Sequence, residues 1–356
     1  MVYLDYAATC PVVKYPQQLY RNVLGERYFF NPNANYAYKE KRLLSEAENR
    51  VKKAIGAKDG KVIFGGTSSQ LIENLFTHIY DETNEYLTIC SVYEHDSVWR
   101  FADQWGNIES LKHVIQTYHG NKQLIVCLMG VNNLTGEIMP VEEIGKLCHE
   151  HNAFYICDMT AMIGHTPIPT DIDEWCDCAV WSGHKLGTEL GIGCCWISDE
   201  LDKWLNGFKL HGTPNLAGAL AMAQAVEDAC DKEYVMSVNK QWYTLMSDLY
   251  YLLKQDSPDV ERIGDKIAST YAINAIRLPG FNARALQSYL ASKEIYIGLG
   301  QSSCADKADR RILCQGYGLS EQEADEVVRI SFGESSNYNE VHELVEKIIE
   351  FKQMFT

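Results

Sequence analysis

Residues 153–197 read AFYICDMTAMIGHTPIPTDIDEWCDCAVWSGHKLGTELGIGCCWI, in which short apolar runs alternate with polar and glycine-containing stretches. The runs at residues 153–157, 178–181 and 192–197 have the length and composition of buried strands. Elsewhere, apolar side chains recur at helical spacing. This alternation is typical of a mainly parallel sheet covered by helices. Similar apolar runs predict further strands at residues 62–64, 86–92 and 124–129, and helical spacing predicts helices within residues 43–55 and 141–148.

The chain is long enough for two domains, because its 356 residues compare with roughly 150 for a typical domain. Around residues 206–230 the alternation gives way to a loop and a helix of small residues. The elements that follow are typical of a smaller α+β domain. We therefore expect a large domain at residues 13–230 and a small one formed by residues 1–12 and 231–356. Its elements are expected at residues 235–254, 271–278 and 327–332 and from Tyr338 onward.

The composition is that of a globular protein with an acidic surplus, since 46% of the residues are hydrophobic and 22% are charged. The 32 basic and 48 acidic side chains give a net charge of −16, which repels phosphate backbones and anionic lipid surfaces. The first twenty residues lack a basic stretch followed by an apolar one, and no apolar run approaches about 18 residues. We expect a cytoplasmic protein that binds neither nucleic acid nor membranes directly.

Polar residues that directly follow apolar runs are the first candidates for a site, because open α/β sheets bind ligands outside the carboxyl ends of their strands. The turn at residues 65–69, GGTSS, precedes a helical pattern and suits a phosphate, although such a run is also an ordinary turn and helix cap. Asp158 ends a run, where a carboxylate can hold a cationic ring nitrogen or a metal, or cap a loop.

Two further candidates are basic. Lys185 closes Ser182-Gly183-His184-Lys185 and would be a nucleophilic amine in a desolvated pocket, or else a solvated surface charge. His95 would stack on a ring or move protons, or else be an ordinary loop histidine. The sequence has no zinc-ligand spacing, no Gly-x-Gly-x-x-Gly and no Walker loop, so we expect no metal. Together the four places fit pyridoxal phosphate, which requires a phosphate cup, a lysine for its aldehyde and an anion beside its pyridine nitrogen.

These residues, in this order, resemble the cysteine desulfurases of the NifS/IscS type within the class V aminotransferase group. The resemblance implies the fold of type I pyridoxal phosphate enzymes, whose large domain holds a mainly parallel seven-stranded sheet. The matching stretches are 3–9 (YLDYAAT), 31–33 (NPN), 94–95 (EH), 131–136 (VNNLTG), 158–160 (DMT), 182–185 (SGHK), 191–193 (GIG), 212–215 (GTPN), 302–304 (SSC) and 329–333 (RISFG).

The resemblance also implies roles for single residues. Lys185 would bind the cofactor's aldehyde, Asp158 would pair with its pyridine nitrogen, and His95 would stack on its ring and assist proton transfer. Arg329 and Asn133 would bind the substrate carboxylate, where a guanidinium fork suits two oxygens. Asn33 is also expected at the substrate. The phosphate would be held by Thr67 or Ser68, by Ser182 and His184, and by Thr213 from a partner subunit of a homodimer.

Most of the twelve cysteines lie in apolar runs and are expected to be buried, reduced thiols. Cys304 instead lies in the polar segment 300–306, GQSSCAD, where an exposed thiol can deprotonate and attack another sulfur. By the resemblance, Cys304 takes the sulfur of L-cysteine as a persulfide, leaves L-alanine and passes the sulfur to an acceptor protein. The alternative is that Cys304 is a thiol on a loop and takes no part in the reaction.

The sequence departs from the family pattern at four positions. Ala161 stands where a glutamine usually contacts the cofactor's ring oxygen, and Leu134 replaces a common glutamate. Tyr36 and Leu210 replace a histidine and an arginine. These changes leave the cofactor prediction nearly intact and bear on the substrate and the rate.

Two other interpretations stay open. One is a different class V enzyme, an amino-acid lyase or aminotransferase in which Cys304 is idle. The other is a degenerate homologue that serves as a scaffold, an interpretation that Ala161 favours. The presence together of Lys185, Asp158, His95 and Arg329 argues against a scaffold, which has no physical need for all four.

Overall fold

The computed structural model describes residues 1–25, 30–82, 85–264, 268–300 and 310–354, which form two compact units. The seven-stranded unit comprises residues 11–130 and 139–232, and the five-stranded unit comprises residues 1–10, 131–138 and 233–356. Residues 131–138 thus group with the five-stranded unit, although the predicted domain limits place them in the large domain. Cys304 lies outside the described residues.

The seven-stranded unit is built on a mainly parallel sheet in the order β2-β8-β7-β6-β5-β3-β4. Strands β4, β3, β5, β6 and β7 pair in parallel, and β8 pairs antiparallel with both β7 and β2. The predicted fold class is therefore confirmed, and each of the six predicted strands of this sheet is present. The strands are β2 (Lys61–Gly65), β3 (Tyr86–Ser91), β4 (Gln104–Gly106), β5 (Gln123–Cys127), β6 (Phe154–Asp158), β7 (Cys178–Ser182) and β8 (Gly193–Ile197).

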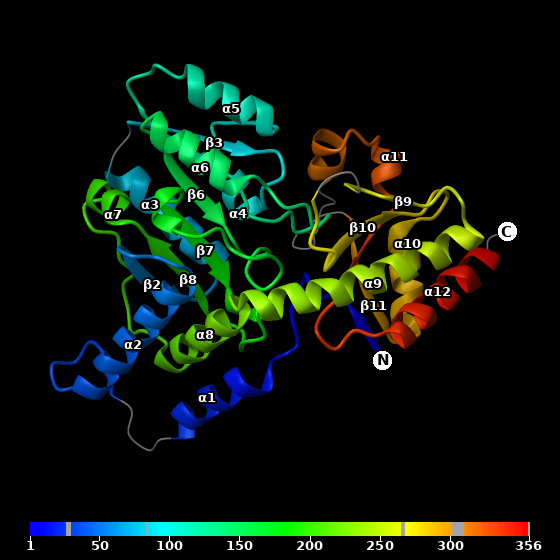
Figure 1. Cartoon of the computed structure of the whole chain (residues 1–356), viewed down its shortest axis with the longest axis horizontal. Coiled ribbons are helices and arrows are strands. Elements are labelled where there is room, and N and C mark those ends of the chain that lie inside the picture. The colour runs from blue at the N-terminus through cyan, green and yellow to red at the C-terminus, as the bar shows by residue number, and fades with distance from the viewer. Residues whose placement is uncertain (26–29, 83–84, 265–267, 301–309, 355–356) are drawn as a thin grey trace. The chain divides into compact units, whose positions relative to one another are not determined.

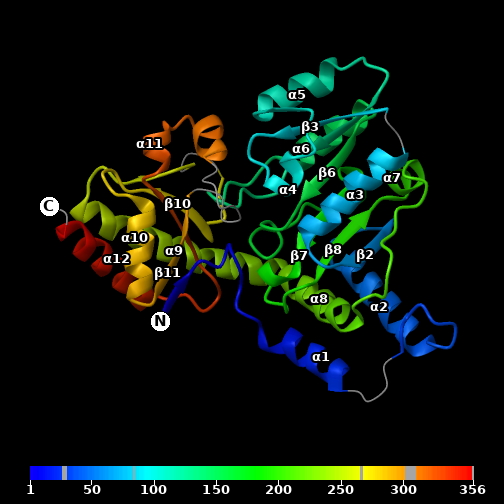
Figure 2. The same ribbon diagram turned by 180° about the vertical axis from the view of Figure 1, so that it is seen from behind.

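Helix α3 (Ser68–Glu82) covers one face of this sheet (Figure 2). Its buried residues Leu71, Leu75 and Ile79 pack in a core cluster with inward-facing strand residues such as Ile156 and Val180. This alternation of faces along the strands places Asp158 and Ser182, two residues further on, on that same face. The other helices of the unit are α1 (Lys14–Gly25), α2 (Tyr38–Ala54), α4 (Asp96–Trp99), α5 (Ile108–Thr117), α6 (Val141–Glu150), α7 (Asp199–Trp204) and α8 (Leu216–Ala229), with the 3₁₀ turns Ile172–Glu174 and Gly183–Lys185 (Figure 1).

The five-stranded unit contains a mostly antiparallel sheet in the order β1-β11-β12-β10-β9, in which β1 and β11 pair in parallel and the β11–β12, β12–β10 and β10–β9 pairs are antiparallel. Its predicted strands and helices are present, as expected for an α+β unit. Its elements are β1 (Val2–Leu4), α9 (Lys232–Asp256, which begins at the boundary), β9 (Glu261–Arg262), β10 (Ile273–Arg277), α10 (Ala283–Ser292), β11 (Ile295–Leu299), the π-helix Ile312–Gly316, α11 (Glu321–Ala324), β12 (Val327–Ser331) and α12 (Tyr338–Gln353).

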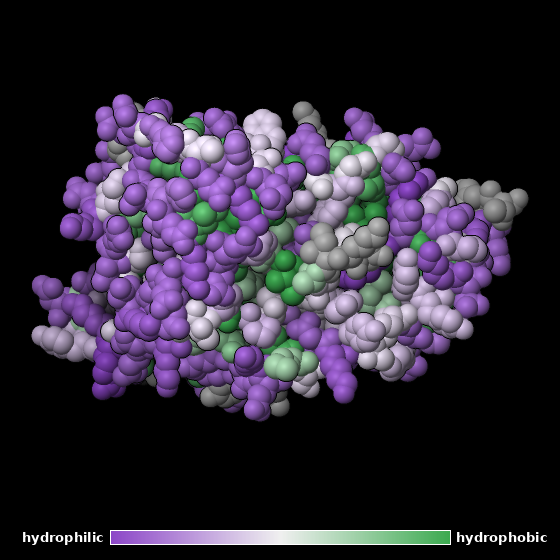
Figure 3. Space-filling model, turned by 45° about the horizontal axis from the view of Figure 1, so that its top comes forward, coloured by the Kyte–Doolittle hydropathy of each residue, from purple (hydrophilic) through white to green (hydrophobic). Residues whose placement is uncertain are grey.

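Hydrophilic residues predominate on the face drawn in Figure 3. Among the described helices, none combines the length and the apolar character needed to cross a bilayer.

Candidate active site

The strand ends of the seven-stranded unit bring three of the predicted places to one edge of the sheet. Asp158 is the last residue of β6 and pairs with Val180 of the neighbouring parallel strand β7. Ser182, the last residue of β7, pairs with Gly193 of β8, and Gly193 also pairs with Gly65 at the end of β2. The carboxyl ends of β2, β6 and β7 therefore share this edge, as expected for a site in an open α/β sheet.

The beginning of α3 lies against the same edge. A Cβ on Gly193 would come within 2.6 Å of the Thr67 carbonyl carbon and 2.8 Å of the Ser68 nitrogen, so only glycine lets the turn approach β8 this closely. The Thr67 hydroxyl accepts a hydrogen bond from the Gln70 N–H at 3.1 Å and thereby caps the helix. The amino end of this 15-residue helix favours an anion.

Two buried hydroxyls lie near the ends of these strands, on Thr160, two residues after Asp158, and on Ser182, the last residue of β7. Asp158 is 8% exposed, and its Oδ1 accepts the Thr160 N–H at 2.9 Å. Among the described residues, the Oγ1 of Thr160 and the Oγ of Ser182 are buried and have no hydrogen-bond partner. Because buried polar atoms in native proteins are nearly always paired, such hydroxyls indicate a place that a polar ligand completes. The donor set therefore fits a phosphorylated, cationic heterocycle such as pyridoxal phosphate.

Lys185 lies in the 3₁₀ turn directly after β7 and is partly buried. Two imidazoles lie within its electrostatic influence. Burial and then the Lys185 charge lower the pKa of His184. Burial also lowers the pKa of His165 to about 4, while its hydrogen bond to the Ala161 carbonyl raises it and Lys185 lowers it. Near neutral pH both histidines are therefore uncharged beside the lysine.

His95 caps the short helix α4 with its ring. Its Nδ1 accepts the backbone N–H of Ser97 at 3.2 Å, so in the neutral ring the proton resides on Nε2. The preceding residue, Glu94, is fully buried, and its Oε1 accepts hydrogen bonds from the Ser91 hydroxyl at 2.6 Å and from the Met129 N–H at 2.8 Å. These bonds fix the loop that carries His95 against the end of β5.

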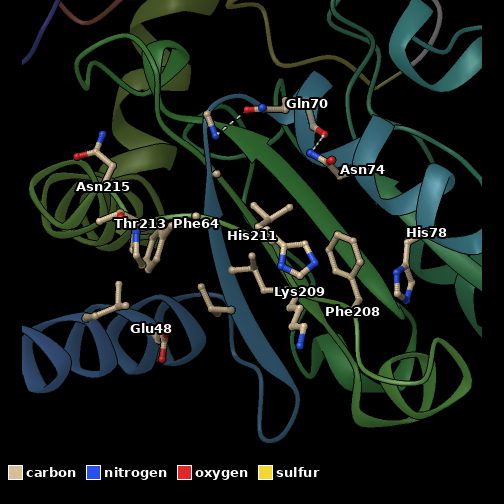
Figure 4. Close-up of a pocket in the computed structure, with 18 of the residues that line it drawn as sticks. Glu48, Phe64, Gln70, Asn74, His78, Phe208, Lys209, His211, Thr213 and Asn215 are labelled. Atoms are coloured by element: carbon tan, nitrogen blue, oxygen red, sulfur yellow. Dashed lines mark hydrogen bonds between the residues drawn. The ribbon is translucent and has the colours of Figure 1, made fainter. Parts of the chain in front are cut away.

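Asn33 and Thr213 lie in two segments that hold each other. The Asn31 side-chain amide donates to the Thr213 hydroxyl at 3.1 Å, and the Asn33 amide donates to the Gly212 carbonyl at 2.9 Å. Thr213 lines an open pocket of about 680 Å³ together with Gln70 at the first turn of α3 (Figure 4).

The five-stranded unit brings the predicted carboxylate-binding residues together. Arg329 on β12 is 4% exposed, and its Nη1 donates to the Asn133 carbonyl at 3.1 Å. Its Nη2 donates to Asp5 Oδ1 at 2.8 Å. A Cβ on Gly298 would lie 2.8 Å from the Arg329 Nε, so this glycine makes room for the guanidinium. Sequence reasoning missed Asp5 as this partner, although Asp5 lies in the matching stretch at residues 3–9.

Each of the four departures from the family pattern has a definite place, and Leu210 is partly buried against the core cluster of the seven-stranded unit and lines the pocket with Thr213. Leu134 is 5% exposed and packs with Leu313 and Val327 in an apolar cluster, which explains an aliphatic side chain there. Ala161 is buried, next to the unpartnered Thr160 hydroxyl. Tyr36 is 68% exposed and contacts only the Phe30 ring among the described aromatic residues.

The profile of the family described as Aminotransferase class-V matches residues 2–344, nearly the whole chain. The chain belongs to the aminotransferase class-V family. The resemblance seen in the sequence is thereby confirmed, and members of the class-V family that act as cysteine desulfurases depend on pyridoxal phosphate.

Curated relatives of this class-V chain carry desulfurase names. The cysteine desulfurase IscS of Dictyoglomus turgidum is 29% identical over 264 residues, which span 65% of each chain. The putative cysteine desulfurase IscS 1 of Bacillus subtilis is 26% identical over 93% of each chain. The cysteine desulfurase IscS of Rickettsia typhi is 24% identical and covers 96% of this chain and 88% of its own.

Solved structures show the same class-V fold. A NifS-like protein from Rickettsia africae superimposes with a TM-score of 0.84 at 20% identity, covering 99% of each chain. The apo structure of a cysteine desulfurase from Thermococcus onnurineus gives a TM-score of 0.78 at 19% identity, covering 98% of this chain and 94% of that one.

Proposed function

We propose that this class-V chain is a pyridoxal phosphate-dependent cysteine desulfurase, which converts L-cysteine to L-alanine and transfers the sulfur to Cys304. The observation that carries the proposal is the sheet edge where Asp158, the unpartnered Ser182 hydroxyl and the turn bearing Lys185 meet. The names of the curated relatives support the choice of cysteine as the substrate.

The cofactor would be held by residues of the seven-stranded unit. Lys185 would bind its aldehyde, and the Asp158 carboxylate would pair with its pyridine nitrogen. His95 would stack on the ring. When bound, the cofactor supplies a sink for electrons released at the α-carbon of the amino acid. Thr67, Ser68, Ser182 and His184 would bind the phosphate, with Thr213 contributed across a homodimer interface.

The five-stranded unit would bind the substrate carboxylate. The guanidinium of Arg329 is already oriented by Asp5 and the Asn133 carbonyl, so its fork loses little rotational freedom when it binds two oxygens. Asn133, and Asn33 in the other unit, would add hydrogen bonds to the substrate. His95, whose neutral ring carries its proton on Nε2, would move a proton from that atom.

Cys304 would be the sulfur acceptor within the chain. Its thiolate would attack the substrate sulfur, so that an S–S bond forms as the C–S bond breaks. The substrate carbon keeps the electron pair of the C–S bond and takes the proton of the substrate thiol, which gives L-alanine and a persulfide anion on Cys304. The pKa values of other thiols support this choice, because burial raises the pKa of Cys10 to about 11 and of Cys230 to about 12, and also raises that of Cys314. An acceptor protein would then remove the sulfur. A cytoplasmic location is a separate prediction.

Mass spectrometry after incubation with L-cysteine tests the proposal. We expect wild-type protein to release L-alanine and to carry one added sulfur on the peptide that contains Cys304. Cys304→Ser should keep the cofactor colour and lose both the added sulfur and the multiple-turnover release of alanine. Cys314→Ser is the matched control and should behave as wild type.

The alternatives predict different results. If Cys304→Ser releases alanine and sulfur from L-cysteine at the wild-type rate, Cys304 is not the sulfur acceptor. If wild-type protein releases no alanine from L-cysteine but converts another amino acid, the chain is another class-V enzyme. If the purified protein stays colourless after addition of pyridoxal phosphate, the scaffold interpretation replaces the enzyme.

A further inference from the structure

A buried polar cluster in the five-stranded unit lies outside the groups considered so far. Tyr317 donates its hydroxyl proton to Glu137 Oε2 at 2.6 Å, and its oxygen lies 2.8 Å from the Thr135 hydroxyl. The Asn132 side-chain amide lies 3.4 Å from the same oxygen. Glu137 is 7% exposed, and Thr135 and Asn132 are almost completely buried. In sequence, Tyr317 is 180 residues from Glu137.

The number of protons on each group decides which atom donates each hydrogen bond. A phenol has one proton, and the Glu137 carboxylate is the acceptor for it. The Thr135 hydroxyl and the Asn132 amide therefore donate to the Tyr317 oxygen. Burial raises the pKa of Glu137, and the hydrogen bond from Tyr317 lowers it. Loss of the Tyr317 hydroxyl would remove one hydrogen bond each from the buried Glu137 carboxylate, Thr135 hydroxyl and Asn132 amide, which weakens the cluster.

The cluster anchors a tight turn. Asn132 Oδ1 accepts the N–H groups of Leu134 at 2.8 Å and Thr135 at 3.2 Å, and the Asn132 carbonyl accepts the Gly136 N–H at 2.9 Å. Gly136 has a φ of +75°, and the Ile273 carbonyl leaves no room for a Cβ there. Asn133 is thus presented from a turn whose two sides are both tied to Tyr317.

The same turn also contacts Arg329, because the Asn133 carbonyl accepts a hydrogen bond from the Arg329 Nη1 at 3.1 Å. We infer that Tyr317 and Glu137 are positioning residues, which hold the turn at residues 131–138 so that Asn133 and Arg329 are prearranged for the substrate carboxylate. This inference rests on the proposed function for the substrate, while the holding of the turn is independent of it. Leu134 supports the arrangement from the apolar side by packing against Leu313.

Tyr317→Phe is the decisive variant, because it removes the hydroxyl and keeps the ring. We expect amide hydrogen exchange in residues 131–138 to accelerate by about tenfold, as one buried hydrogen bond is lost. We also expect the KM for L-cysteine to rise by about tenfold with kcat changed less than about twofold, the signature of lost binding that substrate and transition state share. Tyr251→Phe, at a tyrosine that is 63% exposed on α9 of the same unit, is the matched control and should change neither quantity.

Glu137→Gln provides a second variant with a graded expectation. Its side chain keeps an acceptor oxygen for Tyr317, so both effects should lie between those of wild type and Tyr317→Phe. Unchanged exchange in residues 131–138 of Tyr317→Phe would overturn the inference, whatever the activity. Faster exchange with an unchanged KM would overturn the positioning of the substrate and leave a purely structural role.

Failure of the proposed function looks different from both. If wild-type protein holding pyridoxal phosphate releases no alanine from L-cysteine, the proposed function is refuted. The exchange measurement then decides alone whether Tyr317 and Glu137 hold the turn.

Discussion

The two units differ in how the polar groups at the proposed site are hydrogen-bonded. In the seven-stranded unit, the hydroxyls of Ser182 and Thr160 are buried without a hydrogen-bond partner among the described residues. In the five-stranded unit, the Tyr317 hydroxyl contacts three side chains, and Arg329 is anchored through both terminal nitrogens, while its Nε is buried without a hydrogen-bond partner among the described residues. The first arrangement suits a resident group that completes the bonding, and the second suits a transient ligand that meets preformed donors.

Lys185→Ala should have the largest effect, because it removes the amine that would attach the resident group in the seven-stranded unit. We expect loss of the visible absorbance and a fall in alanine formation of about a thousandfold or more. Absorbance spectra and alanine assays measure both. Lys203→Ala, at an exposed lysine of the same unit, should retain the colour. Equal colour in the two variants would refute the role of Lys185.

Asp5→Asn tests the preformed state of the five-stranded unit. It removes the carboxylate beside Arg329, which is 4% exposed, and leaves a buried cation without its countercharge. We expect the free energy of unfolding of the protein to fall by about 3 kcal/mol. Urea unfolding measures the loss, with Asp248→Asn, whose aspartate contacts an exposed histidine, as the control. A change of the same small size in both variants would contradict the anchoring by Asp5.

Asp158→Asn tests the charge at the sheet edge. A neutral amide keeps the shape and weakens the bond to a cationic ring nitrogen, so cofactor binding should weaken by roughly tenfold to a hundredfold. Equilibrium dialysis with pyridoxal phosphate gives the dissociation constants. Wild-type affinity in Asp158→Asn would show that the ring nitrogen is not at this carboxylate.

The smallest expected effect lies at the opposite end of the sheet from the site. His149 Nε2 contacts Asp177 at 3.0 Å, and this hydrogen bond raises the pKa of His149 from its ordinary value of 6.5. A raised folded pKa adds stability at low pH that is lost as pH rises through that pKa. The stability difference between wild type and His149→Gln should therefore be larger at pH 5.5 than at pH 8.5.

The control for this linkage is His342→Gln, because His342 is 58% exposed where it contacts Asp248 and exposed pairs contribute little. If the stability difference between wild type and His149→Gln does not depend on pH, the hydrogen bond to Asp177 does not stabilise the charged form of His149.

The sequence was sufficient to predict the central strands, because each is an apolar run of strand length. Three short strands escaped prediction: β1, β4 and β9 have three residues or fewer, too few to show a period. β11 was also missed, although its Ile295-Tyr296-Ile297 run has the β-branched and aromatic residues typical of a strand.

The positions of Asp158 and Ser182 at the ends of β6 and β7 were predictable, because each directly follows an apolar run. Partners that only the fold brings together could not be predicted. Asp5 and Arg329 are 324 residues apart, and Glu137 and Tyr317 are 180 apart. Leu134 looked like a change at the substrate, yet its reason lies in the apolar cluster around Leu313.

Peptide mapping after borohydride reduction tests the central claim most directly. Wild-type protein would be incubated with pyridoxal phosphate, reduced so that a lysine bound to the aldehyde becomes a stable amine, and digested. We expect the added mass on the peptide that contains Lys185 and its absence from that peptide in Lys185→Ala. Addition spread over exposed lysines such as Lys209, with none at Lys185, would contradict the account.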